Sequence, residues 1–547
     1  MSSLQDMTMP VITEVQDQEM TGNRPLDILR GIFHLKQFRG CQQEAIESIV
    51  SGQNTVLIMP TGGGKTVCYA VPALMEAKIT VVIFPLLALL LDQVERMRSR
   101  GLNVCYLMSD MDETERESII HRLHSKPPEY NFLFATPETV LSGCVFDLIQ
   151  NLASDHLINF FVIDEAHCID TWGFHFRPSY SELWRLREFR CPILAMTGTA
   201  TRRTQEVIVS NLKLPSDTKV IRQTSNRPNL LYHVLDKKSD GKDALVVLIQ
   251  KEYPEQCGIV YCAERSDTVD VTYRLKTAGV NAVFFHAGMD VCAKQQSVES
   301  WKSGGAHVMC ATVAFGMGID KPDVRFVMHH SVPKDLESYV QESGRAGRDG
   351  HDAHCYIFFR FEDRTKHLRN ISSLPDNDRK LICLNGLNDI VKYCISPVCR
   401  RQQIVGYFDG EDTSGNICNR SCDICSGSKN LHPADHSEDA IKVVSCLESM
   451  QQVNPKVTTK FLVLTFRGSK ANTVISKGFQ NVRQYGMGKD KFSEKQLLKF
   501  VHFLITDNIL AEQLRPANEN STTPYLVKGN NASKLVDKEL CFYFYKQ

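Results

Sequence analysis

Short apolar runs alternate with longer amphipathic segments through the first two thirds of this 547-residue chain. Between about Pro25 and Leu214, five such runs stand among helical patterns: Thr55–Met59, Ile79–Phe84, Phe132–Ala135, Phe160–Ile163 and Ile193–Met196. Strands that alternate with helices form parallel sheets, because each helix carries the chain back to the starting edge. The pattern therefore predicts an α/β domain over residues 25–216.

The alternation starts again after a polar turn at Leu214–Asp217. Four more apolar runs follow it: Gly258–Cys262, Ala282–His286, His307–Ala311 and Arg325–His330. They predict a second parallel α/β domain over residues 217–370. The longest apolar stretch, Val81–Leu91, contains Pro85 and is far shorter than the roughly 20 residues that a membrane span needs. We interpret it as a buried strand that enters a helix, and we expect no membrane partner.

The remaining chain divides into three further parts. Residues 1–24 carry four acidic residues and only Arg24 as a basic one, so they are predicted to be a disordered acidic tail without the features of a signal peptide. Beyond about Phe361, helical patterns lead into a cysteine-rich segment, which predicts a helical metal-binding subdomain over 371–429. A polar linker, Ser426–Ser437, then leads into a last domain over 430–547. At roughly 150 residues per domain, the length accommodates this division.

The 19 cysteines are scattered, often inside apolar runs, which is typical of reduced thiols in an intracellular protein. One group differs: Cys399, Cys418, Cys422 and Cys425 have the spacing C-x18-C-x3-C-x2-C in a polar segment. Four thiolates suit a tetrahedral structural Zn²⁺ ion and leave no open position for chemistry. Cys394 is a competing first ligand that spacing alone leaves open.

A glycine-rich loop directly follows the first apolar run. Met59-Pro60-Thr61-Gly62-Gly63-Gly64-Lys65-Thr66 lies between a predicted strand and a helical pattern, although Met59 replaces the glycine of the general P-loop motif. Backbone N–H groups of Thr61 to Gly64 can surround phosphate oxygens, and Lys65 can reach the β- and γ-phosphates. Thr66 supplies a hydroxyl for Mg²⁺. The loop predicts an ATP site.

A pair of carboxylates ends another buried run about 100 residues later. Asp164-Glu165-Ala166-His167 follows Asn159–Ile163 at the carboxyl end of a strand, where ligands bind in α/β sheets. We expect Asp164 to hold Mg²⁺ and Glu165 to orient or deprotonate the attacking water. His167 completes the candidate catalytic group.

Taken together, these motifs resemble the RecQ type of superfamily-two DNA helicases, and within it the short animal RECQL-type members, from about Pro25 to the C-terminus. The resemblance implies two tandem RecA-like domains, a helical zinc-binding subdomain whose first ligand is Cys399, and a winged-helix domain. In Phe38-Arg39-Gly40-Cys41-Gln42 it implies that Gln42 reads adenine with help from Arg39, while Leu35 stands where relatives place a stacking aromatic. Met196–Thr201 is similar to the third motif, with Gly198 in place of alanine.

The second α/β domain carries two more family motifs. Val313–Pro322 is similar to the fifth motif, and Gln341–Asp349 is similar to the sixth. The resemblance implies that Arg345 and Arg348 act on the γ-phosphate across the cleft between the domains. A planar guanidinium stabilises the charge that develops on the phosphoryl oxygens and links hydrolysis to domain closure.

The segment after the carboxylates resembles the family's aromatic-rich loop, which senses single-stranded DNA. Trp172, Phe176 and Arg177 match and are the predicted DNA contacts. Asp170-Thr171 and Phe174-His175 replace the usual Ser-Gln and His-Asp, and Ala88 replaces a serine in a DNA-contacting motif.

The last domain combines a capped helix with a basic surface. Ser493 and Gln496 form a predicted capping box before the apolar face Leu497, Leu498, Val501 and Leu504. Gln513–Val527 resembles the hairpin that separates the duplex, but its tip, Asn518-Glu519-Asn520, has no aromatic residue. The whole chain has no net charge, yet Gln451–Phe500 contains ten Lys and Arg against two acidic residues, which predicts a duplex-binding region.

Three hypotheses follow. The first is an ATP- and Mg²⁺-dependent DNA helicase with a structural Zn²⁺ ion. The resemblance implies that it moves 3′ to 5′ and acts on single- and double-stranded DNA in the nucleus. A strand-annealing factor or DNA-bound scaffold with weak unwinding is the second hypothesis, motivated by the altered loop and the hairpin tip. An RNA-directed DExH helicase is the third. Protein partners are not predicted.

Overall fold

The computed structural model describes residues 22–546 except 109–110, 173–177, 317–320, 411–416, 428–431 and 519–520. The described residues form two compact units. The first comprises residues 22–225 together with Tyr407–Gly410, and the second comprises the described residues of 226–316, 321–406 and 417–546. The predicted tail, residues 1–24, lies outside the described residues up to position 21, and helix α1 begins at Arg24.

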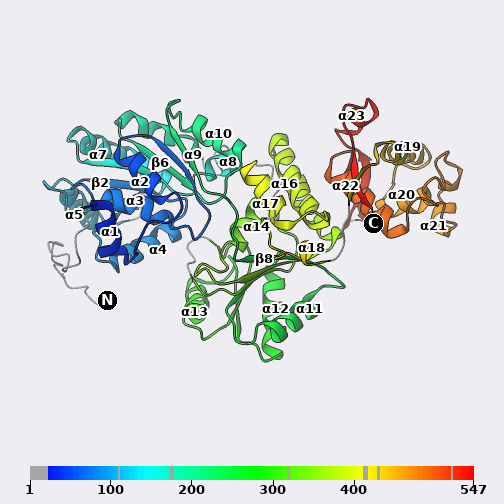
Figure 1. The fold of residues 1–547 in the computed structure, drawn as a ribbon, viewed down its shortest axis with the longest axis horizontal. Helices are drawn as coiled ribbons and strands as arrows, with labels where there is room; N and C mark the ends of the chain where they lie inside the picture. The colour runs from blue at the N-terminus through cyan, green and yellow to red at the C-terminus, as the bar shows by residue number, and fades with distance from the viewer. Residues whose placement is uncertain are drawn as a thin grey trace. The chain divides into compact units, whose positions relative to one another are not determined.

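The first unit contains a seven-stranded parallel sheet in the order β3-β4-β2-β5-β6-β1-β7. Two of its strands, β2 and β6, are labelled in Figure 1. Its strands are β1 (Thr55–Ile58), β2 (Ile79–Ile83), β3 (Val104–Tyr106), β4 (Phe132–Ala135), β5 (Ile158–Ile163), β6 (Ile193–Thr197) and β7 (Lys219–Arg222). All five predicted runs are strands. The edge strands β3 and β7 were not predicted, because each is short and β7 is partly exposed.

Helices cover both faces of this sheet. They are α1 (Arg24–Phe33), α2 (Gln42–Val50), α3 (Lys65–Ala73), α4 (Leu87–Arg98), α5 (Glu113–Leu123), α6 (Pro137–Val140), α7 (Gly143–Ser154), α8 (Cys168–Trp172), α9 (Pro178–Ser181), the 3₁₀ helix Leu183–Phe189, and α10 (Arg202–Asn211). Alternate residues of each strand enter opposite cores, as Phe161 and Val162 do. The result is a three-layer α/β/α domain, and Val81–Leu91 forms a buried strand that leads into a helix, as predicted.

The second unit contains a six-stranded parallel sheet in the order β10-β11-β9-β12-β13-β8. Its strands are β8 (Leu230–Asp236), β9 (Gly258–Tyr261), β10 (Ala282–Phe285), β11 (Val308–Ala311), β12 (Phe326–His329) and β13 (Ala353–Phe359), and its helices are α11 (Lys242–Glu252), α12 (Arg265–Thr277), α13 (Val291–Lys302) and α14 (Leu336–Ser343). The four predicted runs are β9 to β12. Strands β8 and β13 were not predicted, although their apolar sequences are typical of strands.

The helices that directly follow β13, which include the predicted metal-binding subdomain over 371–429, belong to the same unit, except that the end of α17 from Tyr407 belongs to the first unit. They are the 3₁₀ helix Phe361–Asp363, α15 (Arg364–Ser372), α16 (Asn377–Ile395), α17 (Arg400–Asp409) and α18 (Asp423–Ser426). Arg364 and Leu368 bury the inner face of α15, and the C-terminal half of α16 is buried from Leu387 onward. The buried halves of these helices face the rest of the unit.

The C-terminal part has an apolar core that also includes Ile395 of α16. Its elements are β14 (His432–Asp435), α19 (Ser437–Val453), α20 (Thr459–Phe466), α21 (Asn472–Ile475), the 3₁₀ helix Phe479–Asn481, α22 (Glu494–Thr506), β15 (Leu510–Asn518), β16 (Ser521–Lys528), α23 (Ala532–Val536) and β17 (Tyr543–Lys546). The predicted capping box is present in full at Ser493 and Gln496. Antiparallel pairing of β15 with β16 forms the expected hairpin.

The predicted linker Ser426–Ser437 is partly wrong. Its described residues His432–Asp435 form β14, which pairs in antiparallel register with β17 at the other end of this region. A four-residue polar strand has no alternation that a single sequence reveals, and its partner lies more than 100 residues later.

Candidate nucleotide, nucleic-acid and metal sites

The glycine-rich loop joins β1 to the N-terminus of α3, where Lys65 is the first helical residue. Gly62 and Gly64 have φ angles of 81° and 83°, which favour glycine. A Cβ atom on Gly63 would lie 2.6 Å from the Met59 side chain, so Met59 occupies space beside the loop. The backbone geometry therefore supports the predicted phosphate loop despite the unusual first residue.

Lys65 is held above this loop. Its Nζ atom donates to the Met59 carbonyl at 3.3 Å, and a Cβ on Gly198 would approach that Nζ to 3.0 Å. Glycine at position 198 thus leaves room for the ammonium group beside the end of β6. The hydroxyl-bearing Thr66 follows as the second residue of α3, and Thr61 lies in the loop.

Gln42 connects the predicted adenine motif to the phosphate loop. It is 2% exposed and its Nε2 atom donates to the carbonyls of Gly63 at 3.0 Å and Gly64 at 3.3 Å. Its Oε1 atom accepts the backbone N–H of Arg39 at 2.9 Å, whereas Arg39 itself is exposed. Gln42 therefore has a structural role at the loop that the sequence did not reveal.

The two acidic residues lie at the carboxyl end of β5. Asp164 Oδ1 accepts the backbone N–H of Glu165 at 3.0 Å, and Glu165 has a positive φ of 48°. For a residue other than glycine this conformation is strained, and such strain concentrates at functional sites. The pKa of Asp164 is raised to about 7, mainly by burial and to a smaller extent by the neighbouring Glu165 carboxylate. A cation is the group that would restore the charged form here.

His167 links this motif to the third one. Its Nδ1 atom lies 2.9 Å from Thr197 Oγ1 and 3.3 Å from Glu165 Oε2. Thr197 ends β6, and its Oγ1 also donates to the Thr199 carbonyl at 3.1 Å. One imidazole ring therefore contacts residues of both motifs.

Sheet topology brings these groups together. Strands β5, β6 and β1 are neighbours in the sheet and parallel. Their carboxyl ends carry Asp164 and Glu165, Thr197, and the phosphate loop respectively. The predicted nucleotide residues of the first unit therefore meet at one edge of one sheet, which is where α/β folds bind ligands.

In the second unit, the sixth motif follows α14. Arg345 is 6% exposed, and a Cβ on Gly316 would lie 2.9 Å from its Nη2 atom. Arg348 is partly buried. Arg345 therefore packs against the fifth motif, of which residues 317–320 lie outside the described residues.

Arg227 and Asn229, which precede β8, hold the backbone of this motif, and no sequence pattern pointed to them. Arg227 donates to the carbonyls of Gly344, Ala346 and Gly347. Asn229 Nδ2 donates to the Gly347 carbonyl at 2.8 Å, and a Cβ on Gly347 would collide with that atom. These donors fix the loop that carries both arginines.

The predicted DNA-contacting loop is only partly described. Phe176 and Arg177 lie outside the described residues, as do Phe174 and His175. Trp172 is the last residue of α8. Asp170, one of the unusual residues of this loop, accepts the hydroxyl of Thr204 at 3.1 Å and so ties α8 to α10. Ala88 is exposed in the first turn of α4.

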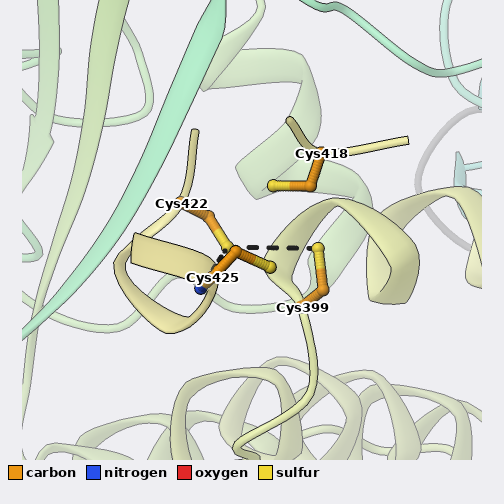
Figure 2. A group of neighbouring side chains, drawn as sticks. All are labelled: Cys399, Cys418, Cys422 and Cys425. Carbon is orange, nitrogen blue, oxygen red and sulfur yellow. Dashed lines mark hydrogen bonds between the residues drawn. The ribbon is translucent and has the colours of Figure 1, made fainter. Parts of the chain in front are cut away.

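The four predicted metal ligands converge on one space (Figure 2). The sulfur atoms of Cys399, Cys418, Cys422 and Cys425 all lie within 4.8 Å of one another. A Zn²⁺ ion with four tetrahedral thiolates separates its sulfur atoms by about 3.8 Å. The distance between the Cys399 and Cys422 sulfur atoms is 3.9 Å, so the donor set fits. Cys394 is buried in α16 and does not belong to this cluster.

The metal cluster is attached to the second sheet by arginines. Arg400 makes two bonds to the Asp423 carboxylate, at 3.0 and 3.1 Å, and Asp423 accepts the backbone N–H of Val234 in β8. Arg401, 2% exposed, donates to the carbonyls of Arg227 and Leu230 and to Ser421. A metal in this cluster would therefore stabilise the helices against the edge of the sheet.

The basic stretch Gln451–Phe500 runs from the end of α19 through α20 and α21 into α22. Eight of its ten cationic residues are exposed, and the other two, Arg467 and Lys477, are partly buried. Lys491 forms an ion pair with Asp439 at 2.7 Å. Exposed cations of one sign create the field that attracts a phosphate backbone.

Four family models match the chain in succession. They are the DEAD/DEAH box helicase over residues 39–207, the helicase conserved C-terminal domain over 240–350, the RecQ zinc-binding domain over 361–426 and the RQC domain over 432–546. Their order agrees with the predicted fold class of two RecA-like domains, a zinc-binding subdomain and a winged-helix domain. Among the described residues, no helix combines the length and apolar character that crossing a membrane requires.

Curated relatives are similar along almost the whole chain. The ATP-dependent DNA helicase hus2/rqh1 of Schizosaccharomyces pombe is 34% identical over 97% of this chain and 40% of its own length. The RecQ-like DNA helicase BLM of Xenopus laevis is 35% identical, over 92% and 38%. The ATP-dependent DNA helicase RecQ of Haemophilus influenzae is 31% identical, over 93% and 80%. The chain thus spans about two fifths of the first two relatives.

Solved structures agree on the fold. The helicase Lhr of Mycobacterium smegmatis, solved with single-stranded DNA and AMP-PNP, has a TM-score of 0.50 at 16% identity over 92% of this chain and 60% of its own. The DUF1998 helicase MrfA, solved with DNA, has a TM-score of 0.52 at 16% identity over 68% and 57%. At 16% sequence identity, this similarity shows a shared fold and nothing further about the chain.

Proposed function

Because the chain belongs to the RecQ family of DNA helicases, we propose that it is an ATP-dependent 3′ to 5′ DNA helicase that separates duplex DNA in repair, recombination or replication. The observation that carries this proposal is the convergence of Lys65, Glu165 and Thr197 at the ends of three adjacent parallel strands. The similarity to RECQL-type members within the family stays a prediction.

The residues of the first unit have defined roles in this proposal. The backbone N–H groups of the loop from Thr61 to Gly64 bind the phosphates with Lys65, and Arg39 and Gln42 recognise adenine. Thr66 and Asp164 hold Mg²⁺, which supplies positive charge to the phosphate oxygens. Glu165 orients the attacking water, and His167 relays the state of the site to the third motif through Thr197.

The remaining roles belong to the second unit and to DNA. Arg345 and Arg348 stabilise the charge that develops on the γ-phosphate during hydrolysis. Trp172, Phe176 and Arg177 contact single-stranded DNA, and the exposed cations of the winged-helix region bind the duplex. The four clustered cysteines bind Zn²⁺, and the donor set supports this ion because four thiolates suit its tetrahedral preference.

A strand-displacement assay on a forked duplex tests this function. We expect unwinding that requires ATP and Mg²⁺ and a 3′ single-stranded tail. A Glu165→Gln variant should bind ATP but hydrolyse it at least a hundredfold more slowly, because water activation is lost. Two outcomes would contradict the proposal. One is unwinding that needs a 5′ tail, and the other is active ATP hydrolysis without any unwinding.

The absence of an aromatic residue at Asn518–Asn520 favours one second candidate, a strand-annealing or scaffold ATPase. It predicts annealing of complementary strands with little displacement in the same assay. Stimulation of ATP hydrolysis by single-stranded DNA compared with RNA tests the third hypothesis, an RNA-directed enzyme, and the RQC and RecQ zinc-binding matches favour DNA. We propose a nuclear location because similar relatives occur in yeast and frog, although others are bacterial.

A further inference from the structure

The β15–β16 hairpin depends on another element for support. It forms a sheet of only two strands. A two-stranded hairpin by itself is marginally stable in water. Its base packs in the winged-helix core through Leu510 and Leu526. Helix α15 of the zinc-binding region contacts the hairpin at two further levels, described next.

The first contact lies at the base of the hairpin. Arg364 of α15 is 2% exposed and forms an ion pair with Glu512 of β15, whose side chain is 7% exposed. The other Nη atom of Arg364 donates to Asn388 Oδ1 of α16 at 2.6 Å. Burial disfavours both charges, raising the pKa of Glu512 and lowering that of Arg364. Each partner is therefore costly to leave alone in this buried position.

Packing around this ion pair fixes its surroundings. The Phe361 ring stacks on His502 of α22 with centroids 3.4 Å apart and planes 2° from parallel. Lys392 of α16 pairs with Asp507 at 2.6 Å. Ile395, the last residue of α16, belongs to the same apolar core as α22. The zinc-binding helices and the winged-helix region thus share an interior.

The second contact lies near the tip. Arg369 Nε donates to Thr522 Oγ1 at 2.9 Å. Thr522 pairs with Pro516, whereas Glu512 pairs with Leu526. The two attachment levels are therefore four residues apart on β15, or about 13 Å. Arg364 and Arg369 are five residues apart on a helix, or about 7.5 Å. Helix α15 supports the hairpin from its base toward its tip.

We propose that Arg364, Glu512 and Arg369 are positioning residues that hold the β15–β16 hairpin against α15, so that the second RecA-like domain carries it as a fixed strand-separating element. This rests on the proposed helicase function, because the hairpin has work to do only if duplex is unwound. Since the tip lacks an aromatic residue, strand separation in this chain depends on where the hairpin is held.

Three single variants of the full chain test the proposal. Glu512→Gln removes the carboxylate from the buried pair, and Arg369→Ala removes the tip contact from an exposed side chain. Lys366→Ala is the matched control: it removes a cation from the same helix, but Lys366 pairs with Glu264 of the α/β domain at 2.8 Å. The measurements are base pairs separated per ATP hydrolysed and hydrogen exchange of peptides covering 510–528.

We expect Glu512→Gln to lower the unwinding rate about tenfold and Arg369→Ala about threefold, with ATP hydrolysis stimulated by single-stranded DNA within twofold of the parent. Hairpin peptides should exchange faster in both, and Arg369→Lys should recover most of the loss because it keeps a donor for Thr522. Lys366→Ala should match the parent. If Glu512→Gln does not fold, the Arg369 variants decide.

Two results would overturn the proposal. One is hairpin exchange at the parental rate in the variants. The other is a loosened hairpin that leaves the number of base pairs separated per ATP unchanged, which includes the case in which unwinding and hydrolysis fall in parallel. A parent chain that hydrolyses ATP and unwinds nothing would refute the helicase function, and hydrogen exchange would still decide whether these residues fix the hairpin.

Discussion

The two α/β units have similar parallel sheets, but the loops that follow the carboxyl ends of corresponding strands differ. In the first, β1 leads through three glycines into Lys65 at the start of α3. In the second, β9 leads through Cys262, Ala263 and Glu264 into Arg265 at the start of α12. A loop with side chains and an acidic residue cannot surround a phosphate as three glycines can. The sheet supplies the scaffold, and the loop decides which unit binds the nucleotide.

Replacing Lys65 tests this comparison most strongly. We expect Lys65→Ala to reduce ATP hydrolysis by more than a hundredfold, or about 2.7 kcal/mol of barrier, because the charge on the phosphates loses its ammonium partner. Arg265→Ala, at the corresponding place in the second unit, should leave the affinity for a fluorescent ATP analogue unchanged. Normal hydrolysis by the Lys65 variant would remove the phosphate-loop assignment.

Removing the metal tests whether the second unit depends on a different centre. Elemental analysis should find one zinc per chain, and Cys422→Ser or a strong chelator should abolish it. Residues 371–429 should then exchange hydrogen faster, because Arg400 and Arg401 hold helices that the ion organises.

Nucleotide affinity should stay unchanged after zinc removal, since none of the cysteine ligands belongs to the phosphate loop. Cys394→Ser is the matched control, because Cys394 is buried in α16 outside the cluster. A chain without zinc, or one that loses zinc on substitution of Cys394, would contradict the four-ligand assignment.

A smaller effect should follow from the contact between the carboxylate and third motifs. Thr197→Val keeps the shape of the side chain but removes the oxygen that lies 2.9 Å from His167. We expect kcat for ATP hydrolysis to fall about tenfold, or about 1.4 kcal/mol, with little change in KM. Thr199→Val is a control on the same segment; an equal loss there would argue against a specific role of Thr197.

Most of the local features of the nucleotide and metal sites could be predicted from the sequence. Gly62 to Thr66 and Asp164 to His167 lie within short motifs whose chemistry depends on neighbouring residues. The four cysteines lie within 27 residues, so spacing alone indicated a metal site. Such features are readable because their partners are close in the chain or belong to adjacent parallel strands.

Contacts between distant residues could not be predicted. Arg227 and Arg401 have no local motif, yet they hold the sixth motif and the zinc helices respectively. Arg364 and Glu512 are 148 residues apart, and each resembles an ordinary surface charge in the sequence. Gln42 was assigned to adenine, whereas its bonds to Gly63 and Gly64 depend on a fold that a single sequence does not specify.

The last effect tests whether the burial of His502 in the winged-helix core makes the stability of the second unit depend on pH. The pKa of His502 is lowered to about 3, mainly by burial and to a smaller extent by the positive charges of Arg364 and Lys499. The unfolded chain, with an ordinary histidine pKa near 6.5, takes up the proton first, so stability is lost as the pH falls from about 6.5 toward 3. At pH 5.5 this amounts to about 1.4 kcal/mol of lost stability.

The variant His502→Phe keeps a ring stacked on Phe361 and removes the group that titrates. The drop in melting temperature between pH 7.5 and 5.5 should therefore shrink in this variant, but not in His351→Gln, whose histidine is 79% exposed. An unchanged drop in His502→Phe would contradict a lowered pKa of His502 in the folded protein.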